Sequence, residues 1–368
     1  MEEKRRAICL IVFMGGLLYT ISFLCLIKTP TRYSLSERRL LQQIPALSIE
    51  SLLDGSFMEK AEAYTQDQFP FRESFRSLKA NVATQFLRRL DNNGIYYTRG
   101  HLGKLDYPLK KEQLQHAADR IGNIYDTYLA GKKMNCYLAI IPDKNYYLAR
   151  TEGYPTMDYE VLYTYMKEEL SQMAFIELRN LLSVEDFYFT DTHWRQERLL
   201  LVAEKILEAM GNGFSGGYKV SLAKEDFFGV YTGQSALKTK GDELFYLTKE
   251  ELEDCLVTSY DTGAAVQKSV YDTQKLEGKD AYEFFLSGSQ ALLTIENPHA
   301  EGKGELILFR DSFGSSLAPL LVEEYEKITL VDIRYIDPSI LEEFIRFEQQ
   351  DVLFLYSTLL LNNSLGMK

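Results

Sequence analysis

The chain has 368 residues, of which 46% are hydrophobic and 26% charged, and its formal net charge is −12. These proportions exclude an intrinsically disordered chain and a protein with many membrane spans. The acidic balance leaves no broad basic surface that could neutralise a run of phosphates, so no nucleic acid is expected as a partner. With four cysteines, and no His, Asp or Glu cluster at ligand spacing, the sequence predicts neither a disulfide framework nor a metal site, and no cofactor.

The N-terminal segment is the strongest local signal in the chain. Residues 8–27 carry no charge and are long enough to cross about 30 Å of hydrocarbon as a helix. Lys4, Arg5 and Arg6 precede this run, so the positive-inside rule keeps the N-terminus in the cytoplasm and sends the rest outward. A cleaved signal peptide is the alternative, but the run is longer than a usual signal core and residues 28–31 make no small-x-small cleavage site. We therefore expect residues 1–28 to form a cytoplasmic tip and a transmembrane anchor, with the lipid bilayer as a partner of residues 8–27 and the main domain extracellular in a single-pass membrane protein.

Residues 29–108 are expected to form a stalk, docking helices and a β ribbon. The stretch 34–90 is polar and helix-prone, and Pro70 interrupts it because a proline disfavours helix at the residue before it. A ribbon is predicted from the β-prone triplet 95–97 and the glycine-bounded turn that follows it.

Residues 109–368 alternate between helix and strand patterns. Apolar positions recur every three or four residues over 114–128, and the short apolar run 136–141 is typical of a buried parallel strand. The same alternation continues with a helix over 159–173, a strand over 175–182 and a helix over 194–210. Such alternation predicts an α/β sandwich with a mainly parallel sheet.

A β-rich insertion is expected at about 212–297, where long helical patterns are missing. The alternation then resumes, with strands predicted at 305–309, 328–333 and 351–356 and helices at 317–325 and 337–349.

Ser312 lies where a predicted strand turns into the next helix. In a parallel α/β sheet, ligands bind outside the carboxyl ends of the strands, and helix N-terminal amides there could stabilise an oxyanion. The alternative is an ordinary helix-capping serine.

A serine nucleophile needs a base, and four histidines are available. His193 follows a predicted strand and opens a helix, and Asp191 stands two residues before it, within reach of the imidazole Nδ1. The alternative is that Asp191 caps the helix while His193 packs against Trp194.

Four further side chains qualify by position for positioning a substrate or an oxyanion. Lys144, Arg334 and Ser357 each follow the carboxyl end of a predicted strand, and Trp194 adjoins His193. For Lys144 the alternative is a solvated loop lysine. Neither a G-x-S-x-G elbow nor a phosphate-binding glycine loop is present.

The runs 191–194 (Asp-Thr-His-Trp) and 311–314 (Asp-Ser-Phe-Gly) together resemble the SGNH-like proteins that include the DHHW-motif family and the alginate O-acetylation proteins. Further stretches that resemble this group are 37–45, 67–72, 142–147, 227–229, 282–286, 295–298 and 331–335. The resemblance implies an SGNH-like three-layer sandwich with a permuted motif order, in which the Asp-His pair precedes the serine. It also implies that Ser312 is the nucleophile, His193 the general base and Asp191 its orienting acid.

Two departures from the family pattern stand out. Thr192 replaces the first histidine of the name-giving motif, and Arg310 occupies the place of the glycine that precedes Asp-Ser in SGNH hydrolases. A large cation beside the nucleophile could narrow the acyl pocket or bind an anionic substrate, which makes Arg310 a further candidate for substrate positioning.

The resulting hypothesis is an extracellular O-acetyltransferase or acetylesterase that acts on a cell-surface or secreted polysaccharide through an acyl-serine. A membrane-bound O-acyltransferase is a candidate acetyl donor. The rival hypothesis is a catalytically idle module that binds glycan or scaffolds a polysaccharide export or modification complex. A sensor domain is disfavoured, because few residues precede the apolar run.

Overall fold

The computed structural model describes residues 2–261 and 263–368. The chain divides into two compact units, one formed by Met1–Asn92 with Gly233–Lys238 and the other by Asn93–Thr232 with Thr239–Lys368. Each unit is described by itself.

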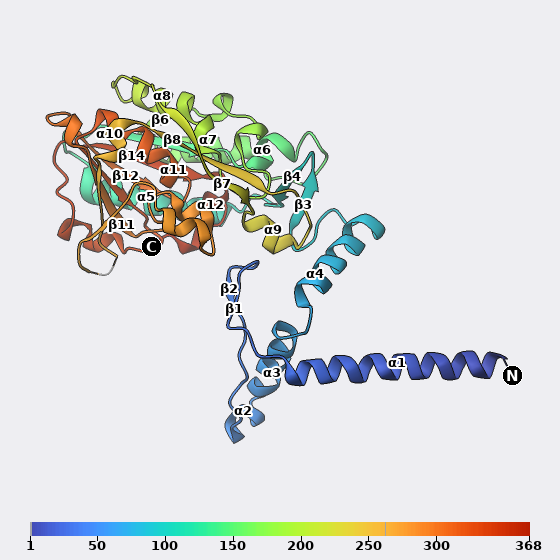
Figure 1. Cartoon of the computed structure of the whole chain (residues 1–368). Coiled ribbons are helices and arrows are strands. Elements are labelled where there is room, and N and C mark those ends of the chain that lie inside the picture. The colour runs from blue at the N-terminus through green and yellow to red at the C-terminus, as the bar shows by residue number, and fades with distance from the viewer. Residues whose placement is uncertain (1, 262) are drawn as a thin grey trace. The chain divides into compact units, whose positions relative to one another are not determined.

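The first unit begins with α1 (Glu2–Ile27), a long apolar helix in which no residue of the apolar stretch is buried. Its length and composition suffice to cross a membrane, and the same features fit a signal sequence, so α1 is either a signal sequence or a membrane anchor. The elements that follow are β1 (Tyr33–Ser34), β2 (Arg39–Leu40), α2 (Ile49–Leu53), α3 (Ser56–Asp67) and α4 (Arg72–Asn81), and a π-helical turn (Val82–Phe86) prolongs α4 (Figure 1).

The predicted interruption at Pro70 is confirmed, because α3 ends at Asp67 and α4 begins at Arg72. Phe71, between the two helices, has a left-handed backbone with φ of 57°.

The second unit contains an eight-stranded mixed sheet (Figure 1). In spatial order its strands are β10 (Val266–Lys268), β9 (Leu256–Ser259), β11 (Leu292–Glu296), β13 (Lys327–Val331), β12 (Glu305–Arg310), β14 (Asp351–Ser357), β5 (Cys136–Ile141) and β6 (Ala174–Ile176). The five strands from β13 to β6 are parallel, and β11, β9 and β10 extend the sheet by antiparallel pairing. The predicted α/β class with a mostly parallel sheet is therefore confirmed.

Helices cover both faces of this sheet. Alternate side chains of β12 enter two different hydrophobic clusters, with Leu306 and Leu308 in one and Ile307 and Phe309 in the other. The first cluster includes side chains of α8 (Leu200–Ala209) and α11 (Gly314–Leu317), and the second includes those of α5 (Lys111–Ile124) and α7 (Tyr159–Glu169). The remaining elements are four short helices and two antiparallel ribbons. The helices are α6 (Lys144–Leu148), α9 (Val230–Ser235), α10 (Glu250–Glu253) and α12 (Thr358–Leu361). One ribbon pairs β3 (Ile95–Thr98) with β4 (His101–Lys104), and the other pairs β7 (Lys219–Phe227) with β8 (Asp242–Thr248).

Several predicted boundaries differ from the structure. Of the strand predicted at 175–182, only the part that overlaps β6 is a strand in the structure. The helix predicted at 194–210 begins at Leu200, after a 3-10 turn. The helix predicted at 317–325 is wrong, since α11 ends at Leu317 and Pro319, which lacks an amide hydrogen, lies in a 3-10 turn. The helix predicted at 337–349 is a 3-10 segment, Pro338–Glu343. Strands β9, β10 and β11, which fall within the expected insertion, extend the main sheet.

Candidate active site

Ser312 lies just beyond the carboxyl end of β12, which is hydrogen-bonded between the parallel strands β13 and β14. It is partly exposed, whereas its neighbours Asp311 and Phe313 are buried. The Asp311 carboxylate holds this turn by accepting hydrogen bonds from the amides of Phe313 (3.0 Å) and Ser357 (2.9 Å). A glycine is required two residues after Ser312, because a Cβ at Gly314 would stand 2.7 Å from the Arg310 Cβ.

The helix that follows Ser312 offers few free amides. The amides of Gly314 and Ser315 donate to the carbonyls of Asp311 (3.1 Å) and Ser312 (3.2 Å), and that of Phe313 is taken by Asp311. The expected set of helix N-terminal oxyanion donors is therefore used within the turn. The Ser312 amide has no hydrogen-bond acceptor among the described residues.

Asp191, His193 and Ser312 form one chain of hydrogen bonds. The Asp191 Oδ1 accepts from the His193 Nδ1 at 2.6 Å, and the His193 Nε2 lies 2.7 Å from the Ser312 Oγ. Because the buried carboxylate holds the proton on Nδ1, Nε2 is left as an acceptor facing the serine hydroxyl. The structure thus brings together three residues that sequence reasoning had grouped, and their catalytic role remains a prediction.

Backbone contacts hold Asp191 in place. Its Oδ1 also accepts the His193 amide at 3.1 Å, and its Oδ2 accepts the Val230 amide at 2.8 Å. Close packing adds to this, since a Cβ on Gly229 would stand 2.3 Å from the Asp191 Cβ. Gly229 was part of the resemblance to the family, but nothing in its local sequence marks it as a neighbour of Asp191.

Aromatic side chains enclose the imidazole. Tyr282 stacks on His193, with 3.8 Å between ring centroids and an interplanar angle of 5°, and its hydroxyl lies 2.9 Å from the Ser316 Oγ. The indole of Trp194 donates to the Phe313 carbonyl (3.1 Å) and to the Ser316 Oγ (2.9 Å). Sequence reasoning assigned no role to Tyr282, because an isolated aromatic residue in this chain is most simply a core residue.

Comparison with known proteins adds a fold-level finding. The sequence matches no protein-family model and no curated protein. The structure matches that of a DHHW family protein from Eubacterium siraeum with a TM-score of 0.61 and 21% identity, over 75% of this chain and 95% of that one. The chain has the fold of a DHHW family protein.

Bacillus cereus PatB1 shares this DHHW-type fold, with a TM-score of 0.59 and 18% identity over 73% of this chain and 96% of that one. A second PatB1 structure, which carries a sulfonyl adduct, matches with a TM-score of 0.56 and 19% identity over 73% of this chain and 95% of that one. The resemblance inferred from the sequence is confirmed as a structural match.

Within the DHHW-type fold, Lys144 is fully buried, so its interpretation as a solvated loop lysine is wrong. Its ammonium donates to the carbonyls of Leu102 (2.7 Å) and Phe189 (3.3 Å) and lies 5.3 Å from the centroid of the Tyr231 ring. Burial lowers the Lys144 pKa to about 7. The nearby Asp242 carboxylate raises this pKa, but its effect is smaller than that of burial. Lys144 thus fastens the segment that leads to Asp191, and no hydrogen bond to Ser312 or His193 is recorded for it in the described part of the chain.

The two arginines at the edge of the sheet meet at Asp332. Arg334 forms a bidentate pair with this carboxylate at 2.8 and 2.5 Å, while the fully buried Arg310 Nη1 lies 3.8 Å from it. Arg310 packs behind the Ser312 turn, with its Nη1 3.4 Å from the Asp311 carbonyl. Burial lowers the Arg310 pKa, and its Nε and Nη2 have no hydrogen-bond partner among the described residues.

The Ser357 hydroxyl accepts a hydrogen bond from the Leu360 amide and so caps the start of α12.

The remaining histidines lie elsewhere. His116 contacts Ser364 (3.1 Å), His299 pairs with Asp254 (2.7 Å), and burial lowers the pKa of His101 to about 3. Among residues 2–261 and 263–368, no group of three or more His, Cys, Asp or Glu side chains is arranged to hold a metal ion.

Proposed function

We propose that this protein is an O-acetyltransferase or acetylesterase that acts on polysaccharide through an acyl-serine at Ser312. One observation carries the proposal, namely the unbroken contact from Asp191 through His193 to Ser312, at 2.6 and 2.7 Å. A hydroxyl, an imidazole and a buried carboxylate in this order are the components of serine acyl transfer. The DHHW-type fold, shared with PatB1, supports the same assignment at the level of fold.

In the first half-reaction, the Ser312 Oγ attacks the acetyl carbonyl carbon as the His193 Nε2 takes the hydroxyl proton. The negative charge passes to the carbonyl oxygen, for which the Ser312 amide is the proposed hydrogen-bond donor. As the tetrahedral intermediate collapses, the C–O bond to the donor alcohol breaks and the imidazolium returns the proton to that alcohol. Asp191 stabilises the imidazolium throughout.

In the second half-reaction, a sugar hydroxyl or water loses its proton to the His193 Nε2 and attacks the acetyl-serine. Collapse releases the acetylated sugar or acetate and restores the Ser312 hydroxyl. The competition between these two acceptors decides whether the protein acts as a transferase or as an esterase.

The location follows from α1 and the basic residues before it. We propose that α1 is an uncleaved anchor, with Lys4, Arg5 and Arg6 in the cytoplasm and the second unit outside, where polysaccharide is accessible. A membrane-bound O-acyltransferase is the proposed acetyl donor.

The test is cleavage of p-nitrophenyl acetate by the full-length protein and by Ser312→Ala. We expect Ser312→Ala to abolish turnover. The control is Ser339→Ala, which removes an exposed hydroxyl later in the chain and should retain turnover. Undiminished turnover in Ser312→Ala contradicts the assignment.

A sulfonyl fluoride should add one sulfonyl group to the wild-type protein and none to Ser312→Ala, as measured by intact mass. Adding oligosaccharide acceptors and comparing acetylated sugar with free acetate distinguishes transfer from hydrolysis. A protein that is neither labelled nor active would instead favour the idle glycan-binding or scaffold module.

A further inference from the structure

Helix α4 and the turn that prolongs it carry an exposed apolar stripe. Phe71, Phe75, Leu78, Val82 and Phe86 recur at helical spacing and are 69%, 48%, 58%, 42% and 81% exposed. This spacing places Phe75, Leu78 and Val82 on one face of the helix, while Phe71 precedes α4 and Phe86 ends the π-helical turn. A contiguous apolar surface of this kind marks a site of interaction with a membrane or another molecule.

The opposite face of α4 is buried. Ala80 and Ala83 are buried, with 0% and 6% exposure, and the Arg76 guanidinium donates to the Gly233 carbonyl at 2.6 Å. The helix is therefore held by one face, and the apolar stripe is the face that remains for a partner.

The charge of this segment is opposite to that of the chain. Residues 71–90 contain five Lys or Arg and one Glu, a net charge of 5 − 1 = +4, whereas the whole chain carries −12. Lys79, Arg88 and Arg89 are exposed. Basic residues beside an apolar helical face are typical of helices that lie on anionic lipid surfaces.

Hydrogen bonds join the start of α4 to the end of α1. Lys28, the first residue after α1, donates from its Nζ to the carbonyls of Gln68 (3.1 Å) and Phe69 (3.3 Å) in the turn that precedes α4. The Gln68 side chain in turn bonds the Thr31 amide (3.0 Å) and carbonyl (2.9 Å). If α1 spans the bilayer, these bonds bring the first turn of α4 to the level of the lipid headgroups.

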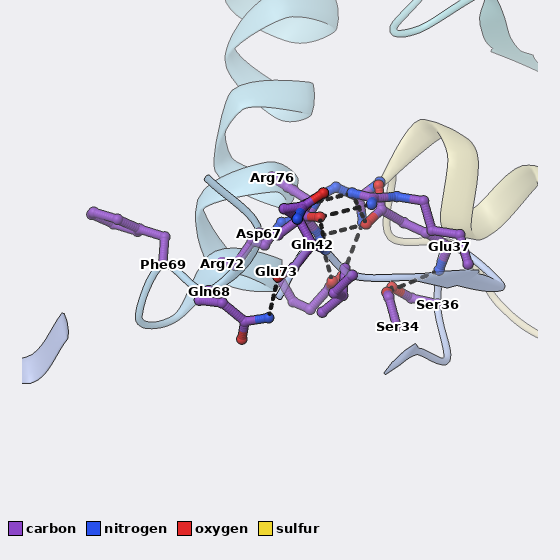
Figure 2. A network of polar contacts seen from close by, with 12 residues as sticks. Ser34, Ser36, Glu37, Gln42, Asp67, Gln68, Phe69, Arg72, Glu73 and Arg76 are labelled. Carbon is purple, nitrogen blue, oxygen red and sulfur yellow. Dashed lines mark hydrogen bonds and ion pairs between the residues drawn. The ribbon is translucent and has the colours of Figure 1, made fainter. Parts of the chain in front are cut away.

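A network of ion pairs makes this junction rigid (Figure 2). Glu37 pairs with Arg72 (2.5 Å) and Arg76 (3.3 Å) of α4, and Asp67 at the end of α3 pairs with Arg39 (2.5 Å) and Arg72 (3.5 Å). The hydrogen bond from Arg39 holds the Asp67 pKa below its ordinary value, so the pair is charged at neutral pH.

A groove of about 440 Å³ opens at the same junction. Its lining combines the charged side chains of Lys28, Arg72, Asp67 and Glu73 with the apolar side chains of Leu35, Leu41 and Phe71.

We propose that α4 and its continuation form an interfacial helix, whose apolar stripe inserts into the outer leaflet of an anionic lipid membrane. The proposal rests on the proposed anchoring role of α1. It assigns the first unit a second, peripheral attachment that fixes the height and orientation of the chain above the bilayer.

The experiment uses full-length protein in nanodiscs of phosphatidylcholine and phosphatidylglycerol, with or without bromine on the upper acyl chain. The reporter is Phe75→Trp, and the native Trp194, which is 0% exposed, supplies a constant background measured in the wild-type chain. Because an interfacial helix lies about 5–10 Å deep, we expect brominated lipid to lower the added emission roughly twofold or more.

Val82→Trp is a second reporter on the same stripe, which covers the case in which one substitution perturbs the fold. Tyr97→Trp is the matched control, because Tyr97 is 51% exposed and lies on β3 in the second unit, and its added emission should not change with bromination. Replacing phosphatidylglycerol with phosphatidylcholine should weaken the quenching of both stripe reporters.

Two outcomes overturn the proposal. Blue-shifted but unquenched emission from both stripe reporters means that protein, either this chain or a second copy, covers the stripe. Emission typical of water means that the stripe is solvated. Two further measurements on the same samples keep the proposals apart. Esterase activity reports the proposed function, and intact mass reports whether α1 is retained. A failure of the interfacial-helix proposal is therefore distinguishable from a failure of the proposed function or of the proposed anchor.

Discussion

Three buried carboxylates around the candidate site each accept several hydrogen bonds. Asp143 accepts from Asn145, Tyr159 and Thr358, and Asp242 accepts from the Phe189 and Thr190 amides and the Thr190 hydroxyl. Despite these bonds, burial raises the pKa of Asp143 to about 6 and raises that of Asp242. Asp191, the third, differs in that one of its partners is the imidazole of His193. At the scale of residues, the site is therefore a set of buried polar contacts, and the loss of one of them lowers the stability of the folded protein.

Asp191→Asn should reduce kcat for p-nitrophenyl acetate by about 10³–10⁴-fold, because the amide no longer selects the tautomer that leaves the His193 Nε2 free. The matched control is Asp254→Asn, which alters an exposed Asp-His pair with His299 and should leave kcat unchanged. Equal activity of Asp191→Asn and the wild-type protein would show that this carboxylate only caps the turn.

Asp143→Asn should change the pH dependence of stability. The folded-state pKa of about 6 exceeds the ordinary value of 3.8, so the native state binds the extra proton. The contribution of Asp143 to stability is therefore complete below pH 3.8 and lost as the pH rises through 6. The wild-type free energy of unfolding should therefore fall by about 2 kcal/mol relative to the variant between pH 4 and pH 6. Urea unfolding at several pH values measures this difference.

The control for that titration is Asp126→Asn, which replaces an exposed carboxylate and should give a curve parallel to the wild type. If Asp143→Asn also runs parallel to the wild type, the buried carboxyl group does not titrate in this range.

At the scale of elements, the site is made by one strand-to-helix junction, after β12, and by two loops, so the strand and helix expected on either side of His193 are absent there. Ser312 follows β12, the Asp191–His193 turn is closed by a bridge between Phe187 and Trp194, and Gly229 passes against Asp191 just before α9. These segments carry side chains that no single element could bring together. The position of Asp191 therefore depends on the close approach of the segment before α9.

Gly229→Ala should lower kcat at least about tenfold, because the new methyl group must displace the Asp191 backbone and misalign the imidazole. Gly213→Ala is the matched control, since a Cβ there meets nothing within 4 Å, and it should retain activity. A Gly229→Ala protein with wild-type kcat and wild-type thermal stability would mean that the loop yields without consequence.

At the scale of the whole molecule, an acidic chain folds as two units, and the first unit begins with an apolar helix. The first unit exposes the apolar stripe and the basic residues of α4, and the second holds the sheet and the candidate site. This division separates the proposed membrane attachment from the candidate site. The proposed anchor can thus be tested without disturbing the site.

Cysteine labelling tests the topology. In spheroplasts of a bacterial host, a membrane-impermeant maleimide should label Ser339→Cys more than the wild-type protein, and should label Glu2→Cys only after the membrane is permeabilised. Labelling of Glu2→Cys from outside would reverse the orientation, and loss of the mass of α1 from the mature protein would identify it as a cleaved signal.

The sequence by itself determined the elements whose signal is local. The apolar run 136–141 is β5 to the residue, the interruption at Pro70 is present, and the turn after β12 carries Ser312 as expected, because burial pattern and proline chemistry act over a few residues. Only the tertiary structure decided that Tyr282 stacks on His193, that Arg310 is buried behind the serine, and that Lys144 binds two carbonyls. Those contacts join residues far apart in the chain, and whether such groups meet depends on strand order and close packing, which no local pattern encodes.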